Sequence, residues 1–447
     1  MRRVGVEQNE ELAVLTRLLR DASGKTEPAD MLATLGPWFR RMNRSDFFIS
    51  VSKRNLPEGQ YKITRVIRAD DDPNFSQSSR INPWRDWTKI PAQAGGLIGE
   101  ILESDEPQVL LDLAIHDDPV LQVTIRDMRS LLAVPSYDNG RALNWALFFR
   151  RSPDGWPDFE LPRIMQDTNI LGLATKSLVD RKRADEANAR LTQQLEQVAS
   201  IQRSLLPPRM PEVEGIELAT SYLTSDQAGG DYYDFFPLPD GRMGILIADV
   251  AGHGPAAATV MAMLRAILHC YEPDGIGPAG IMNYANEHLV ASGLGGTFVT
   301  AFFAFLDPRS GELVYSSAGH NPPRIRRASG DIEPLDGAGT VPLGVLDHLE
   351  AQTATARLDA GDTLVLYTDG ITEAFAPVDA AGRREMFGLE RLDACLNAAS
   401  ADKPGGQPAG ASPSALIDAI HAALLKHVGS MTRDDDQTLV LVRRRAD

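Results

Sequence analysis

The sequence contains little cysteine and no long apolar run. Its two cysteines, Cys270 and Cys395, stand far apart and belong to no CxxC pair, which argues against a disulfide scaffold, a zinc ribbon and an iron–sulfur cluster. No apolar stretch approaches the ~20 residues of a membrane-spanning helix, and the N-terminal residues lack the apolar core of a signal peptide. We therefore expect a cytoplasmic protein with no membrane partner.

Positive charge is also in deficit. The chain has 45 lysines and arginines against 61 aspartates and glutamates, a formal net charge of −16 at pH 7. This charge disfavours phosphate backbones and anionic lipid surfaces, so we expect no nucleic-acid partner. A hydrophobic fraction of 43% is that of an ordinary globular protein, and 447 residues suggest two or three domains.

Residues 9–178 are expected to form a compact α/β domain. Apolar spacing at its start predicts two helices and then two strands, at residues 10–19, 28–42, 46–52 and 61–67. Asn139-Gly140 predicts a tight turn between two further strands. The segments Gly95–Leu121 and Met128–Arg151, in this order, resemble those of a GAF domain, a small-ligand-sensing and dimerising fold.

The resemblance implies a homodimer and a regulatory input, either an unknown small ligand or a partner protein. A covalently attached bilin is not expected because no cysteine precedes Cys270, and the lone His116 is a poor basis for a haem site. Trp84 and Trp87 could line a pocket or cover one end of the core, and we expect the second.

Residues 179–206 are expected to form a helical linker. The run from Leu178 to Leu206 contains no glycine or proline and ends at Pro207-Pro208. Apolar residues recur every seven positions with two polar residues on the same seam: Ala184, Leu191, Val198 and Leu205, then Asn188 and Gln202. This pattern predicts a two-chain coiled coil, and the alternative is a single amphipathic helix lying on its own domain.

The segment Gly229–Gly254 predicts a hairpin with a site at its open end. Two runs of aromatic and branched residues, 232–236 and 244–250, flank the turn residues Pro239-Asp240-Gly241. A register symmetric about Asp240 pairs Tyr233 with Ile247 and Phe235 with Ile245 on one face. The same register places Asp231 opposite Asp249.

Two carboxylates facing each other on a sheet have Cβ atoms about 5 Å apart and repel. A divalent cation would offset this repulsion, and oxygen-only surroundings favour Mg²⁺ or Mn²⁺ over zinc. For these two aspartates alone, an exposed acidic hairpin tip is the alternative. Further carboxylates stand at strand ends, since Asp369 follows the buried run 363–368 and Asp434, Asp435 and Asp436 precede the last strand. Together they predict a four-carboxylate, two-metal cluster.

Five motifs extend this pattern over residues 202–445, in the order GGDYYD, ADVAGHG, SSAGHNPP, YTDGITEA and DDQTLVLV. In them the chain is similar to the SpoIIE-like branch of the PPM family of metal-dependent serine/threonine phosphatases. The resemblance implies that residues 207–447 form an antiparallel β-sandwich flanked by helices, with two Mn²⁺ or Mg²⁺ ions at one end. The whole chain would then be of the α+β class.

The resemblance also implies roles for individual residues. Asp249 would bridge both metals, with the Val250 carbonyl as a further ligand. Asp231, Asp369 and Asp435 would complete the set, and the remaining candidates nearby are Asp434, Asp436, Gly230 and His253. A water activated by the metals would attack the phosphorus of a phosphoserine or phosphothreonine in line.

The histidines depart from the wider family. Eukaryotic-type members carry a histidine two residues after the bridging aspartate, whereas this chain has Ala251 there. His253 could protonate the leaving group or only shape its turn. We expect His320 to hold its turn, with an approach to the substrate as the alternative. No arginine near the start of this domain matches a phosphate clamp, so phosphate affinity would rest on the metals.

These observations predict a sensor-regulated protein phosphatase controlled through the helical linker. For bacterial enzymes of this arrangement, the resemblance implies a phosphorylated anti-sigma-factor antagonist as substrate. One alternative is a non-catalytic dimeric signalling scaffold with a decayed phosphatase fold, against which the presence of all four aspartates argues. Another is a constitutive enzyme whose GAF domain only dimerises.

Overall fold

The computed structural model describes residues 10–68, 82–121, 125–226, 228–271, 277–293, 296–378, 382–398, 411–430 and 432–446. The outer ends of the two expected domains, residues 9 and 447, lie outside these ranges. The chain forms two compact units, Met1–Ala189 and Arg190–Asp447, and each is described by itself. No helix in the described ranges combines the length and apolarity needed to cross a bilayer.

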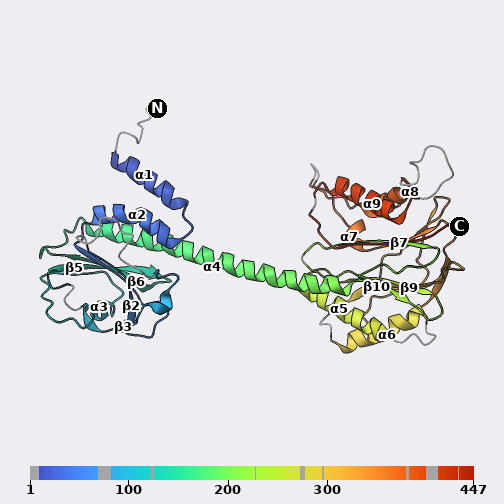
Figure 1. Cartoon of the computed structure of the whole chain (residues 1–447), viewed down its shortest axis with the longest axis horizontal. Helices are drawn as coiled ribbons and strands as arrows, with labels where there is room; N and C mark the ends of the chain where they lie inside the picture. Colours follow the sequence, from blue (N-terminus) through green and yellow to red (C-terminus); the bar gives the residue numbers. More distant parts are fainter. Residues whose placement is uncertain are drawn as a thin grey trace. The chain divides into compact units, whose positions relative to one another are not determined.

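The first unit contains one antiparallel sheet (Figure 1). Its strands lie in the order β3-β2-β1-β6-β5-β4. They are β1 (Phe47–Ser52), β2 (Gln60–Arg68), β3 (Gln93–Ala94), β4 (Gln108–Leu110), β5 (Ser130–Asp138) and β6 (Arg141–Arg150). The helices are α1 (Glu10–Ser23), α2 (Pro28–Asn43), α3 (Gly96–Ile101), the 3₁₀ turn η2 (Trp87–Lys89) and the start of α4 (Leu161–Leu205).

Local sequence signals account for most of these elements. The two helices and two strands predicted at the start of the chain are confirmed, each with small differences at its ends. The turn between β5 and β6 is also confirmed: Asn139 and Gly140 have φ of 51° and 77°, as a two-residue hairpin of this hand requires.

The sheet of the first unit buries both of its faces. Phe47, Ile49 and Val51 belong to a core that also contains α3 residues. Phe48 packs into a second cluster, which includes Phe148 of β6 and residues of α2 and α4. This alternation follows from the period of two along a strand.

Helix α4 differs from the predicted linker. It begins at Leu161, well before residue 179, and its first turns pack on the first unit through residues such as Ile164. Gly172 does not interrupt it, because this position faces Ser136, whose Oγ would lie 3.1 Å from an added Cβ. A small residue is therefore suited to this helix–sheet contact. The linker prediction started the helix at residue 179, whereas the helix already begins at Leu161 and nothing ends it between these two positions.

The second unit consists of two sheets with helices on their outer faces (Figure 1). One sheet has the order β14-β11-β10-β9-β8, with β15 also paired to β11, and the other has the order β13-β12-β16-β17-β7. The strands are β7 (Ile216–Leu223), β8 (Tyr232–Pro237), β9 (Met243–Val250), β10 (Val299–Leu306), β11 (Glu312–Ala318), β12 (Arg324–Arg326), β13 (Ile332–Pro334), β14 (Gly339–Thr340), β15 (Ala354–Arg357), β16 (Thr363–Tyr367) and β17 (Gln437–Arg444).

Helices α5 (Pro255–His269) and α6 (Pro278–Ala291) pack on the first of these sheets, and α8 (Gly388–Ala398) and α9 (Pro413–Val428) pack together beside the second, where α9 contacts β7 and β17. The short α7 (Asp369–Thr372) follows β16. One large core cluster contains residues of both sheets, including Ile247, Phe302 and Leu366. Both units thus combine helices with largely antiparallel sheets, which confirms the α+β class.

The register predicted for the hairpin is confirmed. Tyr233 pairs with Ile247 and Phe235 pairs with Ile245 between β8 and β9. Beyond the last pair, the Val250 amide donates to the Gly230 carbonyl at 3.3 Å, which continues the same register toward the predicted site.

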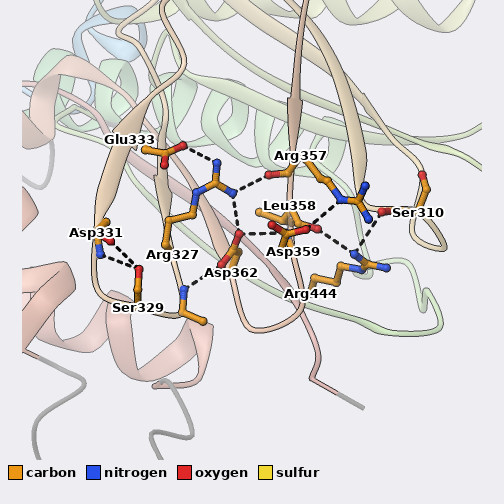
Figure 2. Close-up of polar contacts among 11 residues, drawn as sticks. Ser310, Arg327, Ser329, Asp331, Glu333, Arg357, Leu358, Asp359, Asp362 and Arg444 are labelled. Atoms are coloured by element: carbon orange, nitrogen blue, oxygen red, sulfur yellow. Dashed lines mark hydrogen bonds and ion pairs between the residues drawn. The ribbon is translucent and has the colours of Figure 1, made fainter.

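A polar network fixes the start of β16, at the end of the strand opposite to Asp369 (Figure 2). The buried Asp362 carboxylate accepts hydrogen bonds from the Ala328 and Asp359 amides at 2.8 and 2.9 Å and pairs with Arg327 at 2.7 Å. Arg327 also pairs with Glu333. Because Asp362 is only 2% exposed, its charge depends on these three partners.

We expect Asp362→Ala to lower the free energy of unfolding of the second unit by about 3 kcal/mol, since it leaves two amides without their acceptor and removes one of the two carboxylates that pair with Arg327. Asp359→Ala is the matched control. Its pair with Arg357 is more than 60% exposed on both sides, so its loss should change stability by less than about 0.5 kcal/mol. Scanning calorimetry of the full chain measures both effects, and equal shifts in the two variants would contradict this account.

Candidate metal centre

The predicted aspartates converge where the ends of the two sheets meet. Asp231 directly precedes β8 and Asp249 lies near the end of β9 in one sheet. Asp369 follows β16 by one intervening threonine, and Asp435 and Asp436 precede β17 in the other sheet. Each position is a strand end, so the backbone of each sheet fixes its half of the site.

Asp231 links the two sheets. Its Oδ2 accepts hydrogen bonds from the hydroxyls of Thr368 and Thr438, at 2.8 and 2.5 Å. All three side chains are nearly inaccessible to solvent. The hydrogen bonds hold the Asp231 carboxylate of one sheet against the strand ends of the other.

Asp436 holds the loop that precedes β8. Its Oδ1 accepts from the Ser225 amide and hydroxyl at 2.7 and 3.1 Å, and its Oδ2 accepts from the Gly230 amide at 2.7 Å. The Asp436 amide in turn donates to Asp435 Oδ1 at 2.8 Å. Asp436 is thus engaged with the protein backbone on both oxygens, which suits a positioning residue.

The electrostatics of the cluster are those of crowded like charges. Burial raises the pKa of Asp249 to about 7, and neighbouring carboxylates add to the shift, namely Asp369, Asp435 and Asp436. Burial and the charge of Asp249 hold the pKa of Asp231 well above its usual range. Burial, with the nearby charge of Asp435, raises the pKa of Asp369 to about 6. Folding therefore brings together carboxylates that resist ionising together.

The other predicted candidates lie in different settings. Asp434 is 61% exposed and pairs with Arg384 at 2.7 Å, outside the cluster. Of these two neighbouring aspartates, the geometry therefore favours Asp435 as the candidate metal ligand. His253 is exposed and lies near Asp435, whose pKa is raised mainly by burial and only partly lowered by His253. Gly230 lies against the hairpin, where an added Cβ would stand 2.6 Å from the Val250 carbonyl oxygen.

The donor set fits a hard divalent cation. The side chains at the centre are carboxylates, and a backbone carbonyl, that of Val250, lies beside them. Among the described residues, no three acidic, histidine or cysteine side chains already stand at metal-ligand spacing. The fit therefore rests on donor chemistry and on the mutual repulsion that a cation would offset, not on a preformed cage.

Sequence reasoning missed the residues that support the cluster. Thr368 and Thr438 are hydroxyl residues in otherwise apolar, buried strand segments, and this contrast is the signal that could have identified them. The prediction that Gln202 lies on a coiled-coil seam is wrong. Its side chain is 3% exposed and bonds both backbone groups of Gly229, accepting from the amide at 3.0 Å and donating to the carbonyl at 2.6 Å.

The last turns of α4 thus contact the loop that carries Asp231. Leu205, a second predicted seam residue, also packs against the core of this unit. By contrast, Leu191 is 55% exposed, so the seam remains open only in the middle of the helix. Any two-chain coiled coil would have to use that middle part.

His320 occupies a buried structural position. Its Nδ1 lies 2.9 Å from Thr300 Oγ1, and Thr300 pairs with Asp249 in the ladder between β9 and β10. Burial lowers the pKa of His320 to about 4, so the ring is neutral at pH 7. This setting agrees with the expected role in holding the turn.

Comparisons with known proteins find relatives of this chain, and the family match lies within the second unit. The family model described as Stage II sporulation protein E (SpoIIE) matches residues 239–445. Protein IcfG of Synechocystis sp. is 27% identical over 296 residues, which cover 60% of this chain and 44% of that protein. Phosphoserine phosphatase RsbU of Bacillus subtilis is 28% identical over 253 residues, covering 56% of this chain and 70% of that protein.

The chain spans less than half the length of IcfG and more than two thirds of RsbU. A solved structure, the SiaA-PP2C domain of Pseudomonas aeruginosa, is 23% identical, with a TM-score of 0.49, and covers 59% of this chain and 98% of that domain.

We expect His320→Gln to reduce the acid sensitivity of the second unit. The pKa of His320 is lower in the folded chain than the ordinary value of 6.5, so its neutral ring stabilises the fold above pH 6.5 and this contribution is lost as pH falls toward 4. The loss amounts to up to about 3 kcal/mol.

The aspartates with raised pKa act in the opposite direction, because acid relieves their repulsion, so only the difference between wild type and variant isolates the histidine. Calorimetry at pH 7.5 and 5.0 measures it. The same pH dependence in both proteins would show that His320 does not titrate with unfolding.

Proposed function

Residues 239–445 belong to the SpoIIE family, and on this premise we propose that the chain is a metal-dependent protein phosphatase acting on phosphoserine or phosphothreonine. The observation that carries the proposal is the convergence of carboxylates from both sheets on Asp249, among which Asp231 and Asp436 are buried. The negative charges of Asp369, Asp435 and Asp436 all raise the pKa of this one group. Such a cluster is a typical functional site because its repulsion is offset only by protons or cations.

The named relatives support the reaction class. RsbU and RsbP of Bacillus subtilis are both called phosphoserine phosphatases, and RsbP is 26% identical over 187 residues, which cover 41% of this chain and 46% of that protein. The family match, residues 239–445, covers the motifs from ADVAGHG onward and begins after GGDYYD. The activity of the whole chain is therefore part of the proposal.

We propose two Mn²⁺ or Mg²⁺ ions, held by Asp231, Asp249, Asp369 and Asp435 with the Val250 carbonyl. When bound, such ions lower the pKa of a coordinated water and neutralise charge that develops on a phosphoryl group. The chain's own residues fix where this happens. Thr368 and Thr438 orient Asp231, and Asp436 holds Gly230 beside the Val250 carbonyl.

The proposed control passes through α4. The first unit resembles a GAF domain and would act as the sensor, and the exposed middle of α4 would pair with a second chain in a homodimer. Gln202 supports this route, because it connects α4 directly to Gly229, two residues before Asp231. The proposed substrate is a phosphorylated anti-sigma-factor antagonist, as the resemblance to SpoIIE-like phosphatases implies; the similarity to RsbU, a named phosphoserine phosphatase, supports only the phosphoserine.

We expect Mn²⁺-dependent hydrolysis of p-nitrophenyl phosphate and of a phosphoserine peptide by the full chain. Asp249→Ala and Asp369→Ala should lower the rate by about 100-fold or more, because each removes a carboxylate from the proposed metal set. Asp434→Ala is the matched control, since this aspartate is exposed and paired with Arg384, and should retain activity. Absence of both turnover and calorimetric Mn²⁺ binding in the wild type would favour the non-catalytic scaffold.

We expect Gln202→Leu to lower the phosphatase rate by about 10-fold without loss of the fold. The substitution keeps the volume of the side chain but leaves the amide and carbonyl of Gly229 without their partners, which loosens the loop that carries Asp231. Gln193→Leu, at an exposed position of the same helix, is the control. Equal rates in both variants would mean that α4 does not support the site.

A further inference from the structure

The first unit contains a cavity of about 570 Å³ between its sheet and the helices α2 and α4. Ser50 and Thr64 of the sheet line one side, and Thr168 and Gly172 of α4 line another. This is the sheet face covered by the long helices, not the face that packs against α3. The volume is in the range of cavities that bind small organic molecules.

Three residues that line the cavity carry a buried side-chain polar atom with no hydrogen-bond partner among the described residues. These atoms are Oδ1 of Asn43, Nε1 of Trp145 and Oγ1 of Thr168, and the three residues are 1%, 1% and 6% exposed. The Asn43 amide nitrogen is occupied, since it donates to the Phe39 carbonyl at 2.9 Å. Folded proteins rarely leave such atoms without partners, so the two oxygens indicate a guest that supplies a hydrogen-bond donor, and the Trp145 N–H indicates that the guest also supplies an acceptor.

Aromatic rings and positive charge also line the cavity. Trp84, Trp87 and Phe148 are among the lining residues. Trp84 packs against an apolar cluster, as expected for a cover of the core, and Trp84 and Trp87 also line the cavity, which was the alternative. The Arg65 guanidinium lies 5.0 Å from the centre of the Trp84 ring.

The charge balance of the wall differs from that of the chain. The described lining residues include six basic and four acidic side chains, although the whole chain carries a net charge of −16. Arg65 stays protonated at neutral pH, because burial lowers its pKa only to about 10. A guest with negative charge is therefore favoured over a neutral or cationic one.

We propose that this cavity binds a planar aromatic anion that carries an N–H or O–H donor. The ring would lie among the tryptophan and phenylalanine side chains, the anionic group would face Arg65, and the donor would bond Asn43 Oδ1 or Thr168 Oγ1. This inference goes beyond the proposed phosphatase activity and does not depend on it, because every lining residue belongs to the first unit.

The site involves the helix that continues into the second unit. Thr168, Gly172 and Lys176 are lining residues of α4, and α4 extends without a break from Leu161 to Leu205. A bound anion would therefore contact the helix itself. Binding should also stabilise the first unit in proportion to ligand concentration.

The test uses 1-anilinonaphthalene-8-sulfonate, an aromatic anion with one N–H donor, and the full chain. All five tryptophans lie in the first unit, at residues 38, 84, 87, 145 and 156, so energy transfer from tryptophan to the probe reports binding there. We expect saturable binding at one site per chain and displacement by indole-3-acetate. The uncharged analogue N-phenyl-1-naphthylamine should bind at least 10-fold more weakly.

Matched variants locate the site. Thr168→Val keeps the shape of the side chain and should weaken binding about threefold to tenfold by removing the hydroxyl. Arg65→Met should weaken it about 10-fold, and Ser50→Phe should fill the cavity and abolish it. The controls are Thr34→Val, an exposed threonine of α2 outside the cavity, and Arg68→Met, which lies on the same strand as Arg65 and contacts Phe47 on the other face.

Each outcome decides the proposal. Reduced affinity in the cavity variants with unchanged controls supports it. Equal affinity in Thr168→Val, Arg65→Met and both controls would place the probe elsewhere and overturn it, even if Ser50→Phe fails to fold. Equally tight binding of the neutral analogue would overturn the preference for an anion, and no saturable binding at all would mean that the cavity is closed to such solutes.

Discussion

The crowding of several carboxylates at the ends of two sheets, among them the buried Asp231 and Asp436, is the constraint on which the second unit depends. Each of these groups loses hydration and meets the charge of its neighbours, so the pKa of Asp249, Asp369 and Asp231 rises. Hydrogen bonds from Thr368 and Thr438 offset part of this penalty at Asp231. Only protons or cations can offset the remaining penalty. A carboxylate cluster that destabilises the fold in this way is expected at a functional site.

The same constraint explains the glycines beside Asp231. Asp436 can reach the Gly230 amide only if the two loops lie close together, and a Cβ on Gly229 would stand 2.1 Å from Asp436 Oδ2. At Gly370 it would stand 2.0 Å from the Asp436 carbonyl oxygen. At Gly229 the Asp436 carboxylate occupies the space that a side chain would need, and at Gly370 the backbone of Asp436 occupies it. The glycines of the GGD and TDG motifs thus serve the approach of the loops.

The sequence predicts those structural features that depend on residues close together in the chain. The turn at Asp240 and the period of two give the register of β8 with β9, and hence the facing positions of Asp231 and Asp249, before any tertiary information. It could not predict contacts across long separations. Thr438 reaches Asp231 across 207 positions, Gln202 reaches Gly229 from a helix whose heptad pattern suggested another role, and the cavity forms between segments as distant as Asn43 and Thr168.

Helix α4 has chemically distinct environments at its two ends, and the contacts there limit the free energy that the helix can transmit. Near its start, Thr168 lines a cavity, and near its end Gln202 makes two hydrogen bonds to Gly229. Two such bonds contribute about 1–3 kcal/mol together. A signal that reached the site only by making or breaking them could shift the active population by no more than about 5- to 150-fold, the usual range of allosteric coupling. A larger regulatory effect would require that the helix also change the packing of Leu205 against the core of the second unit.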